Sequence, residues 1–138
     1  APEPFPRQAL VEFLQANAVK VERAAERFTA QNRSESAGYF RGIAASLREM
    51  AERAGGDGPL QLEDLEQRLT VLEEKIYSTL LPAAAESDLV AWRKEMDRQL
   101  APLRRQLTAE QMAHLEKQFT QRKLLEQADL PRLSLFYL

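Results

Sequence analysis

The sequence predicts an all-α fold: an up-and-down bundle of four to five antiparallel helices, kinked or split near Pro102. Three observations predict it. Leu, Ala and Glu are the commonest of the 138 residues, whereas Val, Ile and Thr together account for only 12. Apolar residues recur at steps of three and four, as one face of a helix requires. Prolines and glycines gather between these stretches, where they end helices.

The first half of the chain predicts two helices. Residues 1–6 form an extended leader, and Pro6 is placed to open a helix over about residues 7–31. Asn32 or Ser34 is the expected N-cap of a second helix, and Gly55 is expected to end it in the left-handed conformation. Residues 55–59 form a flexible connection between two helical hairpins. The two apolar stripes are Leu10, Leu14, Ala18, Val21, Ala25 and Phe28, then Phe40, Ile43, Leu47, Met50 and Ala54.

The second half has a sharper pattern. Apolar residues at heptad spacing over residues 62–76 indicate one long helix of a bundle, which Pro82 ends near residue 81. Ser87 is the expected N-cap of a fourth helix, whose apolar stripe continues past Pro102 to residue 107. Thr108 and Gln111 form a capping box that opens a fifth helix, which runs to about residue 128. The heptad residues are Leu62, Leu65, Leu69, Leu72 and Ile76.

Composition excludes several kinds of chemistry. The formal charge is −2, and the chain contains no Cys and one His, His114. Disulfides, thiol catalysis and a multi-histidine metal site within one chain are therefore excluded. His114 lacks the Glu-x-x-His spacing of di-metal bundles, and no Gly-rich phosphate loop is present. We therefore expect no cofactor and no enzymatic activity. We also expect no membrane span, because no apolar run approaches ~20 residues.

The apolar tail of residues 131–138 is the least ordinary feature, because chain ends are usually polar. Three interpretations compete. The tail folds back onto the bundle, docks on a groove or sheet edge of a partner, or marks the junction to a further domain. The candidate partner-binding residues are Leu133, Leu135, Phe136 and Tyr137.

Basic residues cluster between Pro82 and Pro131 and suggest an alternative partner. A face of residues 93–123 is a candidate for contact with phosphate, and hence with nucleic acid. Glu95, Asp97 and Glu116 are interleaved with the cations, which weakens that interpretation. The candidate residues are Arg93, Lys94, Arg98, Arg104, Arg105, Lys117, Arg122 and Lys123.

Together these patterns predict one domain over residues 1–138 that acts as a non-catalytic protein–protein interaction or structural module. Its expected partner is another protein or another domain of the same chain, with a homodimer as a further option. The binding element would be the 62–76 helix or the tail. An accessory nucleic-acid-binding domain is the alternative function. Because the sequence starts at Ala1, a domain of a larger protein is one expectation. The expected compartment is the cytoplasm, with an exported mature form as the alternative.

Overall fold

The computed structural model describes residues 6–138, so most of the expected leader lies outside the described residues. Within that range the chain is all helical and has no strand. The elements are α1 (Arg7–Ala30), α2 (Ser34–Ala54), α3 (Leu62–Leu80), η1 (Leu81–Ala83), α4 (Glu86–Leu100), η2 (Ala101–Leu103), α5 (Ala109–Gln127) and η3 (Leu135–Tyr137). The prediction of an all-α helical bundle is therefore confirmed.

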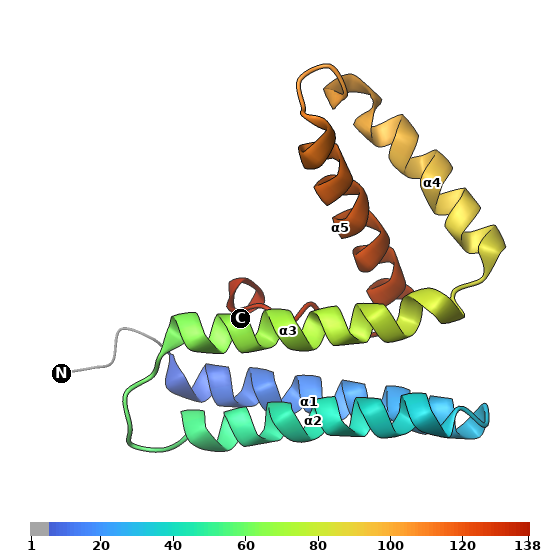
Figure 1. The fold of residues 1–138 in the computed structure, drawn as a ribbon. Coiled ribbons are helices and arrows are strands. Elements are labelled where there is room, and N and C mark those ends of the chain that lie inside the picture. Colours follow the sequence, from blue (N-terminus) through green and yellow to red (C-terminus); the bar gives the residue numbers. More distant parts are fainter. Residues whose placement is uncertain (1–5) are drawn as a thin grey trace.

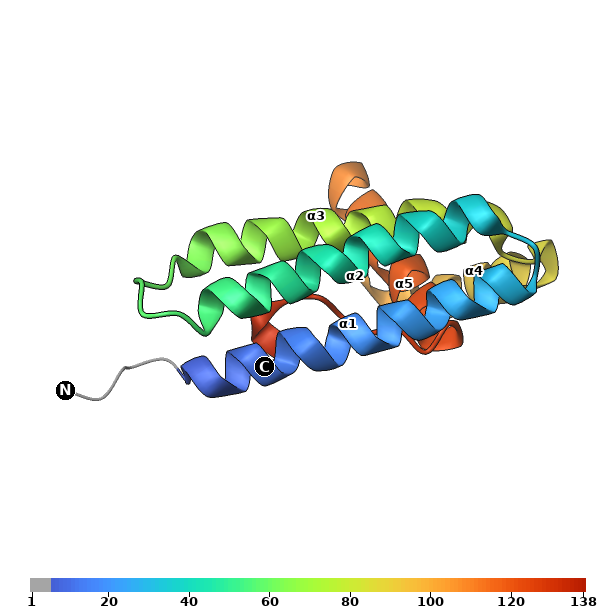
Figure 2. The same cartoon turned by 90° about the horizontal axis from the view of Figure 1, so that it is seen from below.

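The helices are arranged as a three-helix layer and a projecting hairpin. α1 and α2 run antiparallel, and α3 lies along them, reversing the direction of α2 (Figure 1). α4 and α5 form a second antiparallel pair that leaves the end of α3 at a steep angle, and the tail then returns along the three-helix layer (Figures 1 and 2). The hairpin therefore extends the bundle sideways and does not lie parallel to α1–α3.

The main core lies between α1, α2 and α3. The expected stripes of α1 and α2 are buried, and the third helix adds the last three residues of its heptad seam. Burial of these side chains is the dominant stabilising term, at about 25 cal/mol for each Å² of apolar surface removed from water. Beyond the three helices, Leu125, Leu130 and Leu133 also join this core. The seam residues that it buries are Leu69, Leu72 and Ile76.

The α4–α5 hairpin buries few apolar residues outside the main core. Met96, Met112, Phe119 and Leu124 are buried but do not belong to the main core. On α4, Met96 is the one buried residue. Two helices enclose less apolar surface than three, so this hairpin is held less firmly than the α1–α3 layer.

The proline and capping-box predictions agree with the observed helix ends. α3 ends at Leu80, and η1 contains Pro82; α4 ends at Leu100, and η2 contains Pro102, so the chain is split there. The Thr108 hydroxyl accepts from the Gln111 N–H at 3.1 Å, and the Gln111 side chain accepts from the Thr108 N–H at 2.9 Å. Both bonds of a capping box are present, and they open α5.

Three expected caps are wrong. Asn32 does not begin α2; its φ of 60° places it in the left-handed region just after α1. The Asn32 and Arg33 N–H groups donate to the carbonyls of Thr29 and Phe28, which is the Schellman arrangement that ends a helix. Arg33 occupies the cap position of α2 without a side-chain bond, so Ser34 does not cap it either.

The other two differences are at Gly55 and Ser87. Gly55 has φ −79° and stays right-handed. Ser87 lies inside α4, because the helix already begins at Glu86 after the extended Ala85. The expected split at Pro102 is present, since proline lacks the N–H that would bond the preceding turn.

The connection after α2 is tied to the start of α1. The Arg7 guanidinium donates to the carbonyl oxygens of Ala54, Gly56 and Gly58, each at 2.9 Å. One planar side chain thus closes the open end of the α1–α2 hairpin, because its several N–H donors fit diverging carbonyls.

Candidate interaction site

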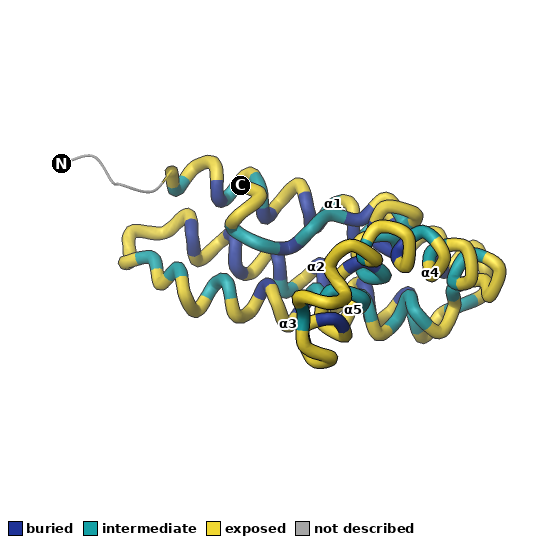
Figure 3. The backbone as a smooth tube through the Cα atoms, turned by 90° about the horizontal axis from the view of Figure 1, so that it is seen from above, coloured by how far each residue is buried: buried dark blue, intermediate teal, exposed yellow. Residues whose placement is uncertain are grey.

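The tail is returned to the three-helix layer by a second Schellman arrangement, at the end of α5. Asp129 has φ 53°, and the Leu130 N–H donates to the Leu125 carbonyl at 2.9 Å. Leu130 and Leu125 are both buried, which supplies the apolar contact that commonly accompanies this motif. Beyond Pro131 the tail runs back along α3 (Figure 3).

Two glutamates on α3 hold the backbone of the tail. The Leu133 N–H donates to Glu73 Oε2 at 2.6 Å. The Leu135 N–H donates to Glu66 Oε2 at 2.8 Å, and the Ser134 hydroxyl donates to Glu66 Oε1 at 2.6 Å. Glu66 and Glu73 are seven residues apart, so two helical turns place them on one face of α3. Hydrogen bonds to a charged acceptor are the stronger kind, so these carboxylates fix the tail.

The surroundings of Glu73 raise its pKa above the usual glutamate value, chiefly because it is largely removed from water. The Leu133 N–H and the Arg132 guanidinium oppose that rise, whereas Glu66 and Glu74 add to it. Arg132 Nε lies 4.0 Å from Glu73 Oε2, beyond hydrogen-bond distance, and this buried nitrogen has no partner in the described part of the chain. Glu73 also accepts from Gln121 Nε2 at 2.9 Å, which links α3 to α5.

The four candidate tail residues separate into an anchor and an exposed end. Leu133 is 2% exposed and belongs to the main core, and Leu135 packs against that core. Phe136 is 87% exposed, and Tyr137 and Leu138 are also exposed. We call residues 136–138 the apolar tip. Its two rings meet edge to face, with centroids 5.4 Å apart, and the Arg132 guanidinium lies 5.1 Å from the Tyr137 ring centroid.

Sequence reasoning found the tail and missed what holds it. The patterns discussed above single out neither Glu66 nor Glu73. The available signal was their seven-residue spacing, directly beside the heptad seam, on a helix whose other seam residues are apolar. That seam itself is not a free surface, because Leu69, Leu72 and Ile76 are buried in the core.

The basic residues between 93 and 123 do not form one uniformly positive surface. Arg104 pairs with Asp97 at 2.6 Å, Lys117 with Glu74 at 3.0 Å, and Lys123 with Glu95 at 3.1 Å. Arg122 lies over the Phe119 ring. The remaining four are exposed and have no carboxylate partner among residues 6–138: Arg93, Lys94, Arg98 and Arg105. Contact with nucleic acid through this face stays a prediction.

The described residues contain no group of three or more His, Cys, Asp or Glu side chains that could hold a metal ion. His114 is exposed. None of the described helices combines the length and apolar character that crossing a membrane requires. No known family model, curated protein or solved structure matches this chain.

Proposed function

We propose that this chain is a non-catalytic interaction module that binds another folded protein, or another domain of the same chain, through the apolar tip. The observation that carries the proposal is the 87% exposure of Phe136 on a backbone that Glu66 and Glu73 hold in place. A phenylalanine left in water can gain free energy by binding in a partner's pocket, at about 25 cal/mol for each Å² buried.

The fixed backbone favours binding, because ordering a flexible peptide on association costs free energy that a preorganised segment does not lose. Leu133 and the hydrogen bonds at residues 133–135 hold the base of the tip. Aromatic side chains surrounded by polar groups are the usual anchors of protein interfaces. Here the Arg132 guanidinium lies over the Tyr137 ring, and the Glu66 carboxylate accepts from the Leu135 N–H, directly before the tip. The expected partner therefore has an apolar pocket with a polar rim.

Photo-crosslinking at position 136 tests the proposal. A photoreactive phenylalanine analogue replaces Phe136 in cells that express the protein, and the same analogue replaces Tyr39 on α2 in a matched control, since Tyr39 is an exposed aromatic residue far from the tail. We expect a discrete adduct from position 136 that is absent from position 39. A second copy in the adduct would identify a homodimer, and a different protein would identify a separate partner.

Purified components then test the contribution of the ring. Phe136→Ser should weaken the crosslinked complex by tenfold or more, because a central aromatic anchor typically contributes about 2 kcal/mol. Tyr39→Ser should leave it unchanged. The proposal is wrong if position 136 gives no adduct beyond that of position 39, or if Phe136→Ser binds the identified partner as tightly as the parent chain.

A further inference from the structure

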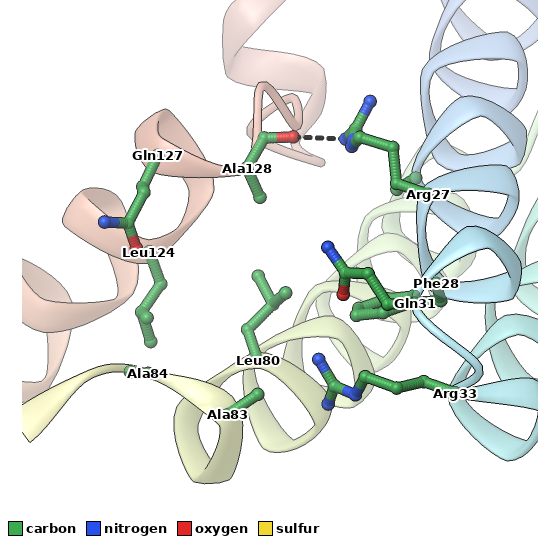
Figure 4. Close-up of a pocket in the computed structure, with 11 residues that line it drawn as sticks. Arg27, Phe28, Gln31, Arg33, Leu80, Ala83, Ala84, Leu124, Gln127 and Ala128 are labelled. Carbon is green, nitrogen blue, oxygen red and sulfur yellow. Dashed lines mark hydrogen bonds between the residues drawn. The ribbon is translucent and has the colours of Figure 1, made fainter.

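A cavity of about 370 Å³ lies where three parts of the fold meet: the end of α1, the junction between α3 and α4, and the end of α5. Figure 4 shows its lining side chains converging from these elements. We call it the junction cavity. Its volume is in the range of pockets that hold small molecules. It is separate from the apolar tip, since none of residues 131–138 lines it.

One wall of the junction cavity is apolar. Phe28, Leu80 and Leu124 contribute its larger side chains, and Figure 4 shows Leu80 in the middle of the group with Leu124 to one side. Phe28 is fixed from behind, because its ring meets Phe40 edge to face with centroids 5.0 Å apart. Alanines widen the cavity where larger residues would fill it; they are Ala24, Ala83, Ala84 and Ala128. A hydrocarbon chain or ring placed against this wall would lose part of its contact with water.

Two arginines at this cavity give it a positive charge. The Arg27 Nη2 donates to the Ala128 carbonyl at 2.6 Å, which holds the guanidinium against the end of α5 (Figure 4). The Arg33 guanidinium lies over the Phe28 ring, 4.6 Å from its centroid. Both cations are therefore preoriented, and each keeps N–H donors beyond these contacts, because a guanidinium has five.

No acidic side chain offsets this charge at the cavity. No Asp or Glu lines it, and neither Arg27 nor Arg33 pairs with a carboxylate among residues 6–138. The lining residue Gln127 donates from its Nε2 to the carboxylate of Asp88 at 2.9 Å, but Asp88 itself does not line the cavity. By contrast, Arg48 on the neighbouring helix is paired bidentately with Glu22. The junction cavity thus combines an apolar wall with two guanidinium groups that lack an anionic partner among residues 6–138.

We propose that the junction cavity binds a small free carboxylic acid that carries an apolar chain or ring. The carboxylate would accept hydrogen bonds from Arg33 and Arg27, since guanidinium groups match the planar geometry of a carboxylate. The apolar part would lie against Phe28, Leu80 and Leu124. An anion without an apolar group would lose the contact with the apolar side chains. An uncharged alcohol would lose the hydrogen bonds between its carboxylate counterpart and the arginines.

Nuclear magnetic resonance titration of the ¹⁵N-labelled chain tests this proposal, with octanoate as the probe and acetate and octanol as comparison ligands. We expect octanoate to cause saturable shifts confined to residues 24–33, 80–84 and 124–128. Acetate and octanol should bind at least tenfold more weakly, because one charge-assisted hydrogen bond or one buried alkyl chain is worth that factor.

Variants separate a built site from a nonspecific effect. Arg33→Met should weaken octanoate binding about tenfold. The matched control is Arg41→Met: Arg41 lies nearby, bonded to Thr29 Oγ1, and does not line the cavity. Ala84→Leu fills the cavity and should abolish binding while both arginines remain. Octanoate shifts that scatter over the surface, or that survive both Arg33→Met and Ala84→Leu in folded protein, would overturn the proposal.

Discussion

Replacing Leu133 by Ala should destabilise the chain strongly, although Leu133 lies only five positions before the last residue of the sequence. Its side chain is 2% exposed and belongs to the main core, together with Leu130 and Leu125. Truncating a buried leucine to alanine costs about 2–5 kcal/mol, from lost burial and from the cavity left behind. We expect about 2–3 kcal/mol here, because the tail can move partway into the space.

Phe136→Ala is the matched control in the same tail. The Phe136 ring is 87% exposed, so its removal should change the free energy of unfolding by less than about 0.5 kcal/mol. Far-ultraviolet circular dichroism during urea denaturation measures both variants. The denaturation midpoint should fall for Leu133→Ala and stay in place for Phe136→Ala.

The slope of the transition adds a second reading. A lower midpoint with an unchanged slope means that the tail remains docked in the variant, whereas a reduced slope means that the tail has left the layer before global unfolding. If Leu133→Ala and Phe136→Ala differ by less than about 0.5 kcal/mol, the argument that Leu133 anchors the tail is refuted.

Three further predictions concern the supports of the fold. Burial raises the pKa of Glu73, so its contribution to stability is fullest below the usual glutamate pKa of 4.5 and falls as pH rises through the raised folded value. Urea titrations should therefore show the parent chain gaining stability relative to Glu73→Gln between about pH 7 and about pH 4; a constant difference would contradict this. Thr108→Ala removes one bond of the α5 capping box and should cost about 1 kcal/mol in the same assay, whereas Thr70→Ala, at an exposed site within α3, should cost less. Amide hydrogen exchange should be faster in α4 and the first half of α5 than in the middle of α1 and α2, because the hairpin buries few apolar residues outside the main core; equal protection would contradict this.

The helices and most of their breaks could be predicted from the sequence because the signals are local. The α1 and α2 stripes, the proline positions and the capping box each lie within a few residues of the feature they control, and all agree with the structure. Asn32 shows the limit of such reasoning. Its residue type suits both an N-cap and a left-handed position after a helix, and the structure has the second.

The interaction site was only half predictable. The sequence by itself marked the tail as unusual, because five apolar residues in its last six positions are visible without a structure. It did not determine which of them face water. Only the tertiary structure decided that Leu133 is an anchor and Phe136 is exposed, because that division depends on Glu66 and Glu73. Glu66 accepts from the Leu135 N–H, 69 positions further along the chain, and Glu73 accepts from the Leu133 N–H, 60 positions further along.

The direction of the α4–α5 hairpin and the position of the junction cavity were likewise decided only by the tertiary structure. Local periodicity states which face of a helix is apolar, but it does not state which other helix covers that face. Arg27 meets the Ala128 carbonyl across 101 positions of the chain. The sequence therefore determined the helices, most of their ends and the unusual apolar composition of the tail. The structure alone decided which distant helices and side chains meet, because those contacts form only when the whole chain buries its apolar faces together.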